Sequence, residues 1–259
     1  MTQSIHPTAI VDPSASIAAD VIIGPYAIIG PQVTIGKGSR IESHAVVKGP
    51  SIIGEDCHIF QFATVGEATP DLKYQGEETW LKMGDRNVVR EGATIHRGTI
   101  QDLGETRIGS DNLIMAYAHV GHDCVIGNHC ILVNNSSLAG HVWVGDWAIL
   151  GGYTLVHQRV KIGAHAFTGF GTGVSMDVPA FVTASGHRAE PKGINSEGLK
   201  RRGYTAEQIA NITKAYKLLY RRKLKLDEAL VQIRAIDPDC EELGLFISSI
   251  SSSTRGIMR

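Results

Sequence analysis

The sequence has few aromatic residues and few cysteines, and it lacks long apolar runs. Aromatic residues make up only 6% of the 259 residues, so large rings cannot dominate the core. The four cysteines show no CxxC spacing, which argues against a disulfide framework. No stretch approaches the ~18 consecutive apolar residues of a membrane-spanning helix, and the first residues lack a signal-peptide pattern. We therefore expect a cytoplasmic protein without membrane insertion.

An excess of charge of either sign is also absent. Lys+Arg 25 against Asp+Glu 26 leaves a net charge of -1, which excludes bulk binding of nucleic acid. The charges are nevertheless unevenly placed, because nine basic residues and a single acid, Glu207, lie between Lys200 and Leu226. A solvated helix face would explain this segment, but the uneven placement favours a docking surface for an acidic partner or a phosphate-bearing substrate.

An aliphatic residue recurs every six positions. It is Ile or Val at eleven consecutive steps from Ile5 to Val65, and the pattern returns from Met83 to Ile95 and from Ile108 to Ile162. This period suits neither an α-helix nor an alternating strand. It is typical of short strands joined by tight turns, for which the 29 glycines supply backbone freedom. Three such units close a triangular coil of 18 residues, and coils stack about 4.8 Å apart through parallel pairing.

The pattern therefore predicts a mainly β fold. We expect a parallel β-helix over residues 1–177 with two outward loops, at about 66–82 and 96–107, where the period breaks. Residues 178–259 are expected to form a linker followed by an α-helical domain. Thr205 and Gln208 form a capping box for a first helix, and further helices are expected over 227–236 and 241–251.

A coil of 18 residues predicts which side chains stack. His122 and Asp123 lie one coil before Gly140 and His141, and His96, His119 and His157 map to the same edge. Histidine can take a proton near neutral pH, and an unshielded glycine N–H can stabilise an oxyanion. The pattern therefore indicates acyl transfer to a hydroxyl by a general base, without a nucleophilic Ser or Cys.

Other residues favour simpler interpretations, and one rival stays open. Five histidines at single corners are expected to be solvated: His6, His44, His58, His129 and His165. Cys57, Cys124 and Cys130 fall at the small inward position and are interpreted as core filler. Clustered histidines also favour a zinc site.

Longer motifs extend this interpretation to a family. The stretches PDLKYQGEET, TIHRGT, AHVGHDCVIGNHCILVNN, LAGHVWVGDWAILGG, NSEGLKRRG and STRGIMR resemble the UDP-N-acetylglucosamine 3-O-acyltransferases of the hexapeptide-repeat transferases. The resemblance implies a left-handed β-helix, a homotrimer, and transfer of a (3R)-3-hydroxyacyl chain from acyl carrier protein to UDP-N-acetylglucosamine. This reaction is the first step of lipid A biosynthesis. The acyl chain would travel on the phosphopantetheine of the carrier, with no cofactor or metal bound to this chain.

The resemblance also implies residue roles. His122 would be the general base, Asp123 its orienting partner and Gly140 the oxyanion donor. The predicted substrate-binding residues are Asp71, Lys73, His96, His119, His141, His157, Gln158, Asn195, Glu197, Arg201 and Arg202. Phe170 falls where the family sets acyl-chain length, and its bulk favours a shorter chain. Arg159 departs from the aromatic residue that the family usually has.

Three alternatives remain beside this one. The related N-acyltransferase carries a large domain before its repeats, whereas the period here begins at Ile5. A γ-class carbonic anhydrase would predict bound zinc. A structural or ice-binding solenoid would need regular outward rows of Thr or charge, which the outer positions lack.

Overall fold

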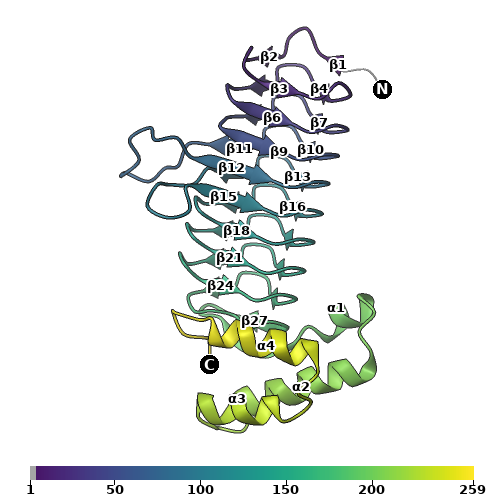
Figure 1. Ribbon diagram of the computed structural model, residues 1–259, viewed down its shortest axis with the longest axis vertical. Helices are drawn as coiled ribbons and strands as arrows, with labels where there is room; N and C mark the ends of the chain where they lie inside the picture. The colour runs from purple at the N-terminus through teal and green to yellow at the C-terminus, as the bar shows by residue number, and fades with distance from the viewer. Residues whose placement is uncertain (1–3) are drawn as a thin grey trace.

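Residues 4–259 are described by a computed structural model, which has the shape of a long three-sided prism with helices at one end (Figure 1). Each coil contributes one short strand to each of three sheets. The first sheet contains β1 (Ser4–Ile5), β4 (Ile22–Ile23), β7 (Arg40–Ile41), β10 (His58–Ile59), β13 (Val88–Val89), β16 (Leu113–Ile114), β19 (Ile131–Leu132), β22 (Ile149–Leu150), β25 (Phe167–Thr168), β27 (Val182–Ser185) and β28 (Glu190–Ile194).

The other two sheets complete the prism. The second contains β2 (Ile10–Val11), β5 (Ile28–Ile29), β8 (Val46–Val47), β11 (Thr64–Glu67), β14 (Thr94–His96), β17 (His119–Val120), β20 (Ser137–Leu138), β23 (Leu155–Val156) and β26 (Gly173–Val174). The third contains β3 (Ser16–Ile17), β6 (Val33–Ile35), β9 (Ser51–Ile53), β12 (Trp80–Met83), β15 (Glu105–Ile108), β18 (Val125–Ile126), β21 (Trp143–Val144) and β24 (Lys161–Ile162). We call the edges of the prism the 1–2, 2–3 and 3–1 corners after the sheets they join.

The six-residue period explains the core. The aliphatic residue of each repeat points inward, and from Ile23 to Ile162 these residues are at most 3% exposed. Ile5, in the first coil, is 39% exposed because no coil precedes it. Strands one coil apart pair in parallel and in register, for example His119 with Ser137 and Leu138 with Val156. The predicted fold class, mainly β with a hexapeptide-repeat β-helix and a small C-terminal α-helical part, is confirmed.

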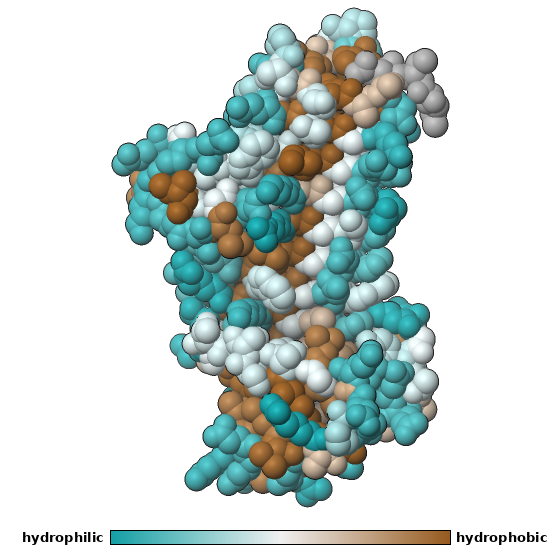
Figure 2. All heavy atoms as spheres, viewed as in Figure 1, coloured by the Kyte–Doolittle hydropathy of each residue, from teal (hydrophilic) through white to brown (hydrophobic). Residues whose placement is uncertain are grey.

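Both predicted loops leave the prism at the 2–3 corner. Residues 68–79 connect β11 to β12, and residues 97–104 connect β14 to β15. Both loops are a few residues shorter than predicted, because the flanking strands include residues at the ends of the predicted ranges. Figure 1 shows the two loops projecting from the same side of the prism. On the face seen in Figure 2, apolar residues form a band along the prism, whereas the projecting loops are mostly hydrophilic.

The C-terminal part contains α1 (Ser196–Arg201), α2 (Ala206–Tyr220), α3 (Leu226–Arg234) and α4 (Glu241–Ser251). The capping box at Thr205 and Gln208 is present at the start of α2. The segment after residue 178 is more ordered than the expected linker, because β27 pairs in parallel with β25 and in antiparallel with β28. Near the C-terminus, Met258 N donates to Asp177 O, so the chain end returns to the last coil. Within residues 4–259, no helix combines the length and apolar character needed to cross a lipid bilayer.

Candidate active site

The 2–3 corner brings His122, Asp123 and Gly140 together. His122 Nδ1 lies 2.8 Å from Asp123 Oδ2, and the Asp123 side chain is fully buried. Since an ionised carboxylate only accepts hydrogen bonds, Nδ1 of His122 donates and Nε2 is left with a free lone pair. Burial would raise the pKa of Asp123, but hydrogen bonds from His122 and Thr99 outweigh it and hold the pKa below its usual value.

Gly140 lies directly under the imidazole of His122. A Cβ atom on Gly140 would lie 2.5 Å from His122 Nε2, so any other residue at this position would displace the ring. Pro13 and Pro31 occupy the same turn position at the 2–3 corner in earlier coils, and Pro7 and Pro25 occupy it at the 1–2 corner. Proline has no N–H, so the coil does not need an N–H donor at this position. The Gly140 N–H finds no acceptor within residues 4–259, and it is free to bind an oxyanion.

Two further histidines lie beside this pair and are kept neutral. His96 and His119 meet edge to face at 5.2 Å, and the Thr94 hydroxyl lies 2.8 Å from His119 Nδ1. Burial, followed by the neighbouring His119, lowers the pKa of His96 to about 4. Burial and the charge of His122 lower the pKa of His119. These rings therefore face the base as neutral hydrogen-bonding groups near pH 7.

His141 lies edge to face with His122 at 4.9 Å. Its Nδ1 atom is 2.6 Å from Asp102 Oδ2 and 3.9 Å from Asp123 Oδ2. Arg159 lies one coil beyond His141 at the same corner, and its Nη2 lies 3.5 Å from His141 Nε2. Four of the five histidines predicted for one edge, His96, His119, His122 and His141, thus lie close together.

The fifth, His157, is exposed and lines a cavity of about 300 Å³ with Leu155, Val156, Gly173, Val174, Ser175, His187 and Arg188.

Asp71 and Lys73 lie on the first loop. Lys73 N donates to Asp71 Oδ1, and Leu72 between them is fully exposed. Arg97 is 8% exposed and donates to the backbone oxygens of Gly49 and Gly66 on the prism and to the Tyr74 hydroxyl on the loop, so it ties the loop to the prism. The sequence argument missed Arg97, although it belongs to the TIHRGT motif.

Asn195, Glu197, Arg201 and Arg202 are near a different edge. The Asn195 side chain accepts from Gly198 N and caps α1, while Glu197 pairs with Lys200 in solvent. Arg202 donates to His165 Nδ1 and to Trp147 O at the 3–1 corner, whereas Arg201 is exposed. Within one chain, this group and His122 therefore lie on different edges of the prism. Gln158 is exposed beside His157.

The structure also tests the simpler interpretations of three cysteines and of His165. Cys57, Cys124 and Cys130 are buried, as expected for core filler, and burial raises the pKa of Cys124 to about 12. The expectation for His165 was wrong. It is 8% exposed and stacks on Phe181 at 5.2 Å, because the C-terminal part covers its corner.

Metal binding was the main rival for the histidine cluster. His122, Asp123 and His141 offer ligand atoms within 4.8 Å of one another. Zinc–nitrogen bonds are about 2.0–2.1 Å long, and the Nδ1 atoms of both histidines already face carboxylates. A metal held through these atoms would have to replace both hydrogen bonds, so the geometry favours a proton-transfer network.

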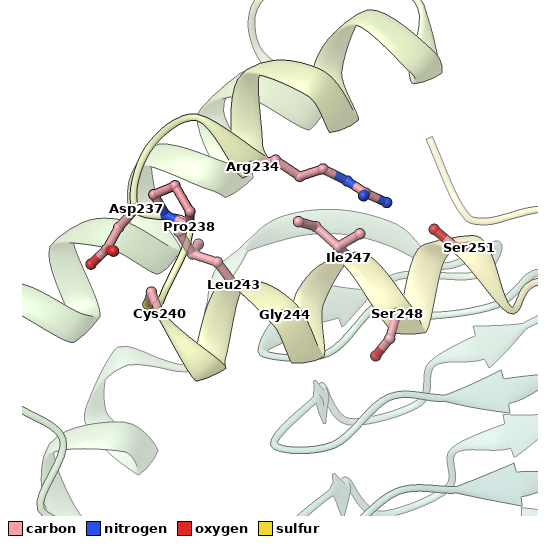
Figure 3. Close-up of a pocket in the computed structure, with 9 residues that line it drawn as sticks. All are labelled: Arg234, Asp237, Pro238, Cys240, Leu243, Gly244, Ile247, Ser248 and Ser251. Atoms are coloured by element: carbon pink, nitrogen blue, oxygen red, sulfur yellow. The ribbon is translucent and has the colours of Figure 1, made fainter.

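A larger cavity of about 590 Å³ lies elsewhere, between α3 and α4 (Figure 3). Its lining includes Arg234 of α3 and Ile247 of α4, which face each other across the opening. None of its nine lining residues is among the predicted site residues. The side-chain chemistry therefore places the candidate site at the 2–3 corner.

Comparisons with known proteins show the family to which the chain belongs. The family model "Udp N-acetylglucosamine O-acyltransferase; Domain 2" matches residues 177–258, and the bacterial transferase hexapeptide model matches residues 4–37 and 105–140. The acyl-[acyl-carrier-protein]–UDP-N-acetylglucosamine O-acyltransferase of Ectopseudomonas mendocina is 59% identical over 99% of both chains. The chain belongs to the UDP-N-acetylglucosamine O-acyltransferase family.

Solved structures of this family superpose closely on the chain. LpxA from Acinetobacter baumannii has a TM-score of 0.96 and 50% identity, covering 98% of this chain and 99% of that one. The UDP-N-acetylglucosamine acyltransferase of Arabidopsis has a TM-score of 0.87 and 35% identity, covering 98% and 100%. Members of the UDP-N-acetylglucosamine O-acyltransferase family are O-acyltransferases, and this chain is one as well.

Proposed function

We propose that the chain transfers a (3R)-3-hydroxyacyl group from acyl carrier protein to the glucosamine 3-hydroxyl of UDP-N-acetylglucosamine, the first step of lipid A biosynthesis. The relatives' names supply acyl carrier protein and UDP-N-acetylglucosamine, and the sequence resemblance supplies the (3R)-3-hydroxyacyl group and the 3-hydroxyl. The observation that carries the mechanism is the stacking of the His122 imidazole on Gly140, with Asp123 held against Nδ1.

The geometry supports general-base catalysis. Nε2 of His122 takes the proton of the sugar 3-hydroxyl as its oxygen attacks the thioester carbonyl. The Gly140 N–H donates to the oxyanion of the tetrahedral intermediate. The intermediate then collapses, the C–S bond breaks, and the imidazolium returns its proton to the leaving pantetheine thiolate. Asp123 stabilises the imidazolium between these steps.

A covalent acyl-enzyme is not needed for this reaction. Cys124 is adjacent to Asp123 in the chain, but its pKa of about 12 leaves almost no thiolate near pH 7. Its sulfur is also fully buried and points to a backbone oxygen, that of Ala139. The hydroxyl of the sugar is therefore the nucleophile, and we propose no resident metal or cofactor.

The site is proposed to be completed by a second copy of the chain. Arg202 and Asn195 lie near the 3–1 corner and His122 lies at the 2–3 corner, so one substrate can reach both groups only between two prisms. A contact between two different edges is heterologous, and it closes into a ring when the rotation allows. We propose the homotrimer on this basis. Its cleft would hold UDP near Asn195, Glu197, Arg201 and Arg202, and the acyl chain along the second sheet towards Phe170.

The acyl carrier protein is proposed to dock on the helical part. Apart from Arg201 and Arg202, which are proposed to hold UDP, the other seven basic residues are all exposed, on α1, α2 and the turn after α2: Lys200, Lys214, Lys217, Arg221, Arg222, Lys223 and Lys225. Positive charge concentrated in this part of the chain raises the rate of encounter with an acidic partner.

An acyl-transfer assay tests the proposal. Purified wild type, His122→Ala and His44→Ala are compared with a panel of 3-hydroxyacyl carrier proteins and UDP-N-acetylglucosamine. His44 is a matched control because it is also a corner histidine, but at the 1–2 corner, where it stacks with Tyr26 and Phe62. We expect turnover in the wild type and His44→Ala, and a loss of at least about 10³-fold in His122→Ala. No turnover with any donor, or substantial turnover in His122→Ala, would refute the proposal. Zinc in the purified protein would instead support a metal site at the histidine cluster.

A further inference from the structure

The second loop, residues 97–104, contacts both imidazole–carboxylate pairs of the site. Thr99 N donates to Asp123 Oδ1 at 2.9 Å, and Thr99 Oγ1 donates to Asp123 Oδ2 at 2.6 Å. Thr99 and Asp123 are each 2% exposed. Asp102 of the same loop faces His141 Nδ1 at 2.6 Å. The loop therefore reaches back to the corner from which it leaves.

These contacts determine which carboxylate accepts a hydrogen bond from which imidazole. Oδ2 of Asp123 has two imidazoles within reach, Nδ1 of His122 at 2.8 Å and Nδ1 of His141 at 3.9 Å. Two donors from Thr99, one on each oxygen, fix the plane of the carboxylate. Asp102 meanwhile satisfies His141, so Asp123 remains available to His122.

We propose that Thr99 and Asp102 are positioning residues for the acyl transfer, which assign Asp123 to His122 and keep the lone pair of His122 on Nε2. This inference rests on the proposed function. Thr99 is buried behind Asp123 and does not touch the reacting atoms, so it acts through the carboxylate. If the carboxylate turned towards His141, Nδ1 of His122 would lose its acceptor and the proton could move to Nε2. A ring with its proton on Nε2 cannot accept the substrate proton there.

Isosteric variants test the role of Thr99. Thr99→Val removes the hydroxyl donor and keeps the shape, and Thr99→Ser restores the donor. Thr106→Val is the matched control, since Thr106 is fully buried nearby and its hydroxyl has no partner within residues 4–259. We expect Thr99→Val to lower kcat about 10- to 100-fold with little change in KM for UDP-N-acetylglucosamine. Thr99→Ser should recover most of kcat, and Thr106→Val should match the wild type.

A spectroscopic measurement tests the positioning without turnover. Nitrogen NMR spectra of protein labelled with ¹⁵N-histidine report the tautomer of each ring, and His122→Ala assigns the His122 signals. We expect the Nδ1–H tautomer of His122 in the wild type and a mixture of tautomers in Thr99→Val. Asp102→Asn, at an exposed loop position that does not threaten the fold, should shift the His141 signals and lower kcat about 5-fold or more.

The outcomes separate the two proposals. Equal kcat in Thr99→Val and Thr106→Val, or an unchanged tautomer of His122 in Thr99→Val, would overturn the positioning role of Thr99. Unchanged His141 signals in Asp102→Asn would overturn the role of Asp102. Absence of transfer by the wild type would instead refute the proposed function, and the tautomers would still decide the positioning.

Discussion

The imidazole of His122 rests on the α-carbon of Gly140, 18 residues further along the chain. A methyl group at Gly140 would lie 2.5 Å from Nε2, well inside van der Waals contact. The same coil register leaves the Gly140 N–H without an acceptor within residues 4–259. The stacking of one coil on the next therefore places a proton acceptor, His122 Nε2, beside a hydrogen-bond donor for an oxyanion, the Gly140 N–H.

Substituting Gly140 should therefore abolish activity without unfolding the protein. In Gly140→Ala, the new methyl group displaces the ring of His122, and we expect kcat to fall by about 10²-fold or more. Gly152→Ala is the matched control, because Gly152 occupies the equivalent turn position at the 1–2 corner and its nearest non-neighbouring atom would lie 3.4 Å from the methyl group. The acyl-transfer assay and thermal melts check both variants. Similar activity in the two would show that the contact under His122 is unimportant.

Phe170 is expected to limit the acyl chain. It lies at the 1–2 corner, is 78% exposed in one chain and meets Tyr153 edge to face at 5.7 Å, so a second copy could close a pocket against it. Phe170→Gly should shift the preference towards longer chains. Each added methylene that becomes buried contributes about 0.8 kcal/mol, roughly a fourfold gain in kcat/KM.

The control for this prediction is Phe62→Ala, which removes an exposed ring from the same corner several coils away. Competition between hydroxyacyl carrier proteins of different length measures the preference. An unchanged preference in Phe170→Gly would remove Phe170 from chain selection.

Arg97 should hold the first loop against the prism. It donates to Gly49 O at 2.6 Å, to Gly66 O at 2.8 Å and to the Tyr74 hydroxyl at 3.2 Å. In Arg97→Met these buried and half-buried acceptors lose their donor, and we expect the free energy of unfolding to fall by about 3 kcal/mol. Residues 68–79 should become sensitive to protease, and KM for UDP-N-acetylglucosamine should rise because Asp71 and Lys73 lose their position.

Arg40→Met serves as the control, since Arg40 is exposed and only 3.5 Å from Glu42. Its effect on stability should stay within about 0.5 kcal/mol. Protease resistance of the loop in Arg97→Met equal to that of the wild type would contradict the anchoring role.

Stability should fall between pH 6.5 and pH 4, and His165 contributes to this loss beside His96, whose pKa is also about 4. Burial, and then the charge of Arg202, lowers the pKa of His165 to about 4. An unfolded histidine has a pKa of about 6.5, so the unfolded state binds the extra proton in this range and stability is lost as pH falls. The slope for one such group reaches about 1.4 kcal/mol per pH unit. Below pH 4 the folded state also takes the proton, and this contribution levels off.

Urea unfolding at several pH values and one protein concentration measures this slope. His165→Gln should be less stable at pH 7, because Arg202 and Tyr204 lose the ring as a partner. Its free energy of unfolding should also change less steeply with pH, because one fewer proton is taken up on unfolding between pH 6.5 and pH 4. His129→Gln is the control for removing a histidine ring from the same corner. The prediction fails if His165→Gln and the wild type have parallel pH profiles.

The repeat made much of the site predictable before the structure. Because the coil length is constant from Ile108 to Ile162, residues 18 apart must stack, and this placed His122 over Gly140. His96 was placed on the edge of Gly121 by the further assumption that the second loop bulges out without rotating the faces, and Ile95 does pair with Val120 in the structure. The repeat could not place Thr99 or Asp102. A loop without a period gives no register, although its exit at the corner of His122 was a signal that it could reach the base.

The sequence by itself determined the prism, its inward aliphatic residues and the stacking of one coil on the next, since each follows from a short period that local turns enforce. Only the tertiary structure decided that Thr99 donates two hydrogen bonds to Asp123 and that Asp102 faces His141. It also decided that Asn195 and Arg202 lie near a different edge of the prism from His122. These contacts join segments from the loops and the C-terminal part, whose paths depend on long-range packing and not on a repeat.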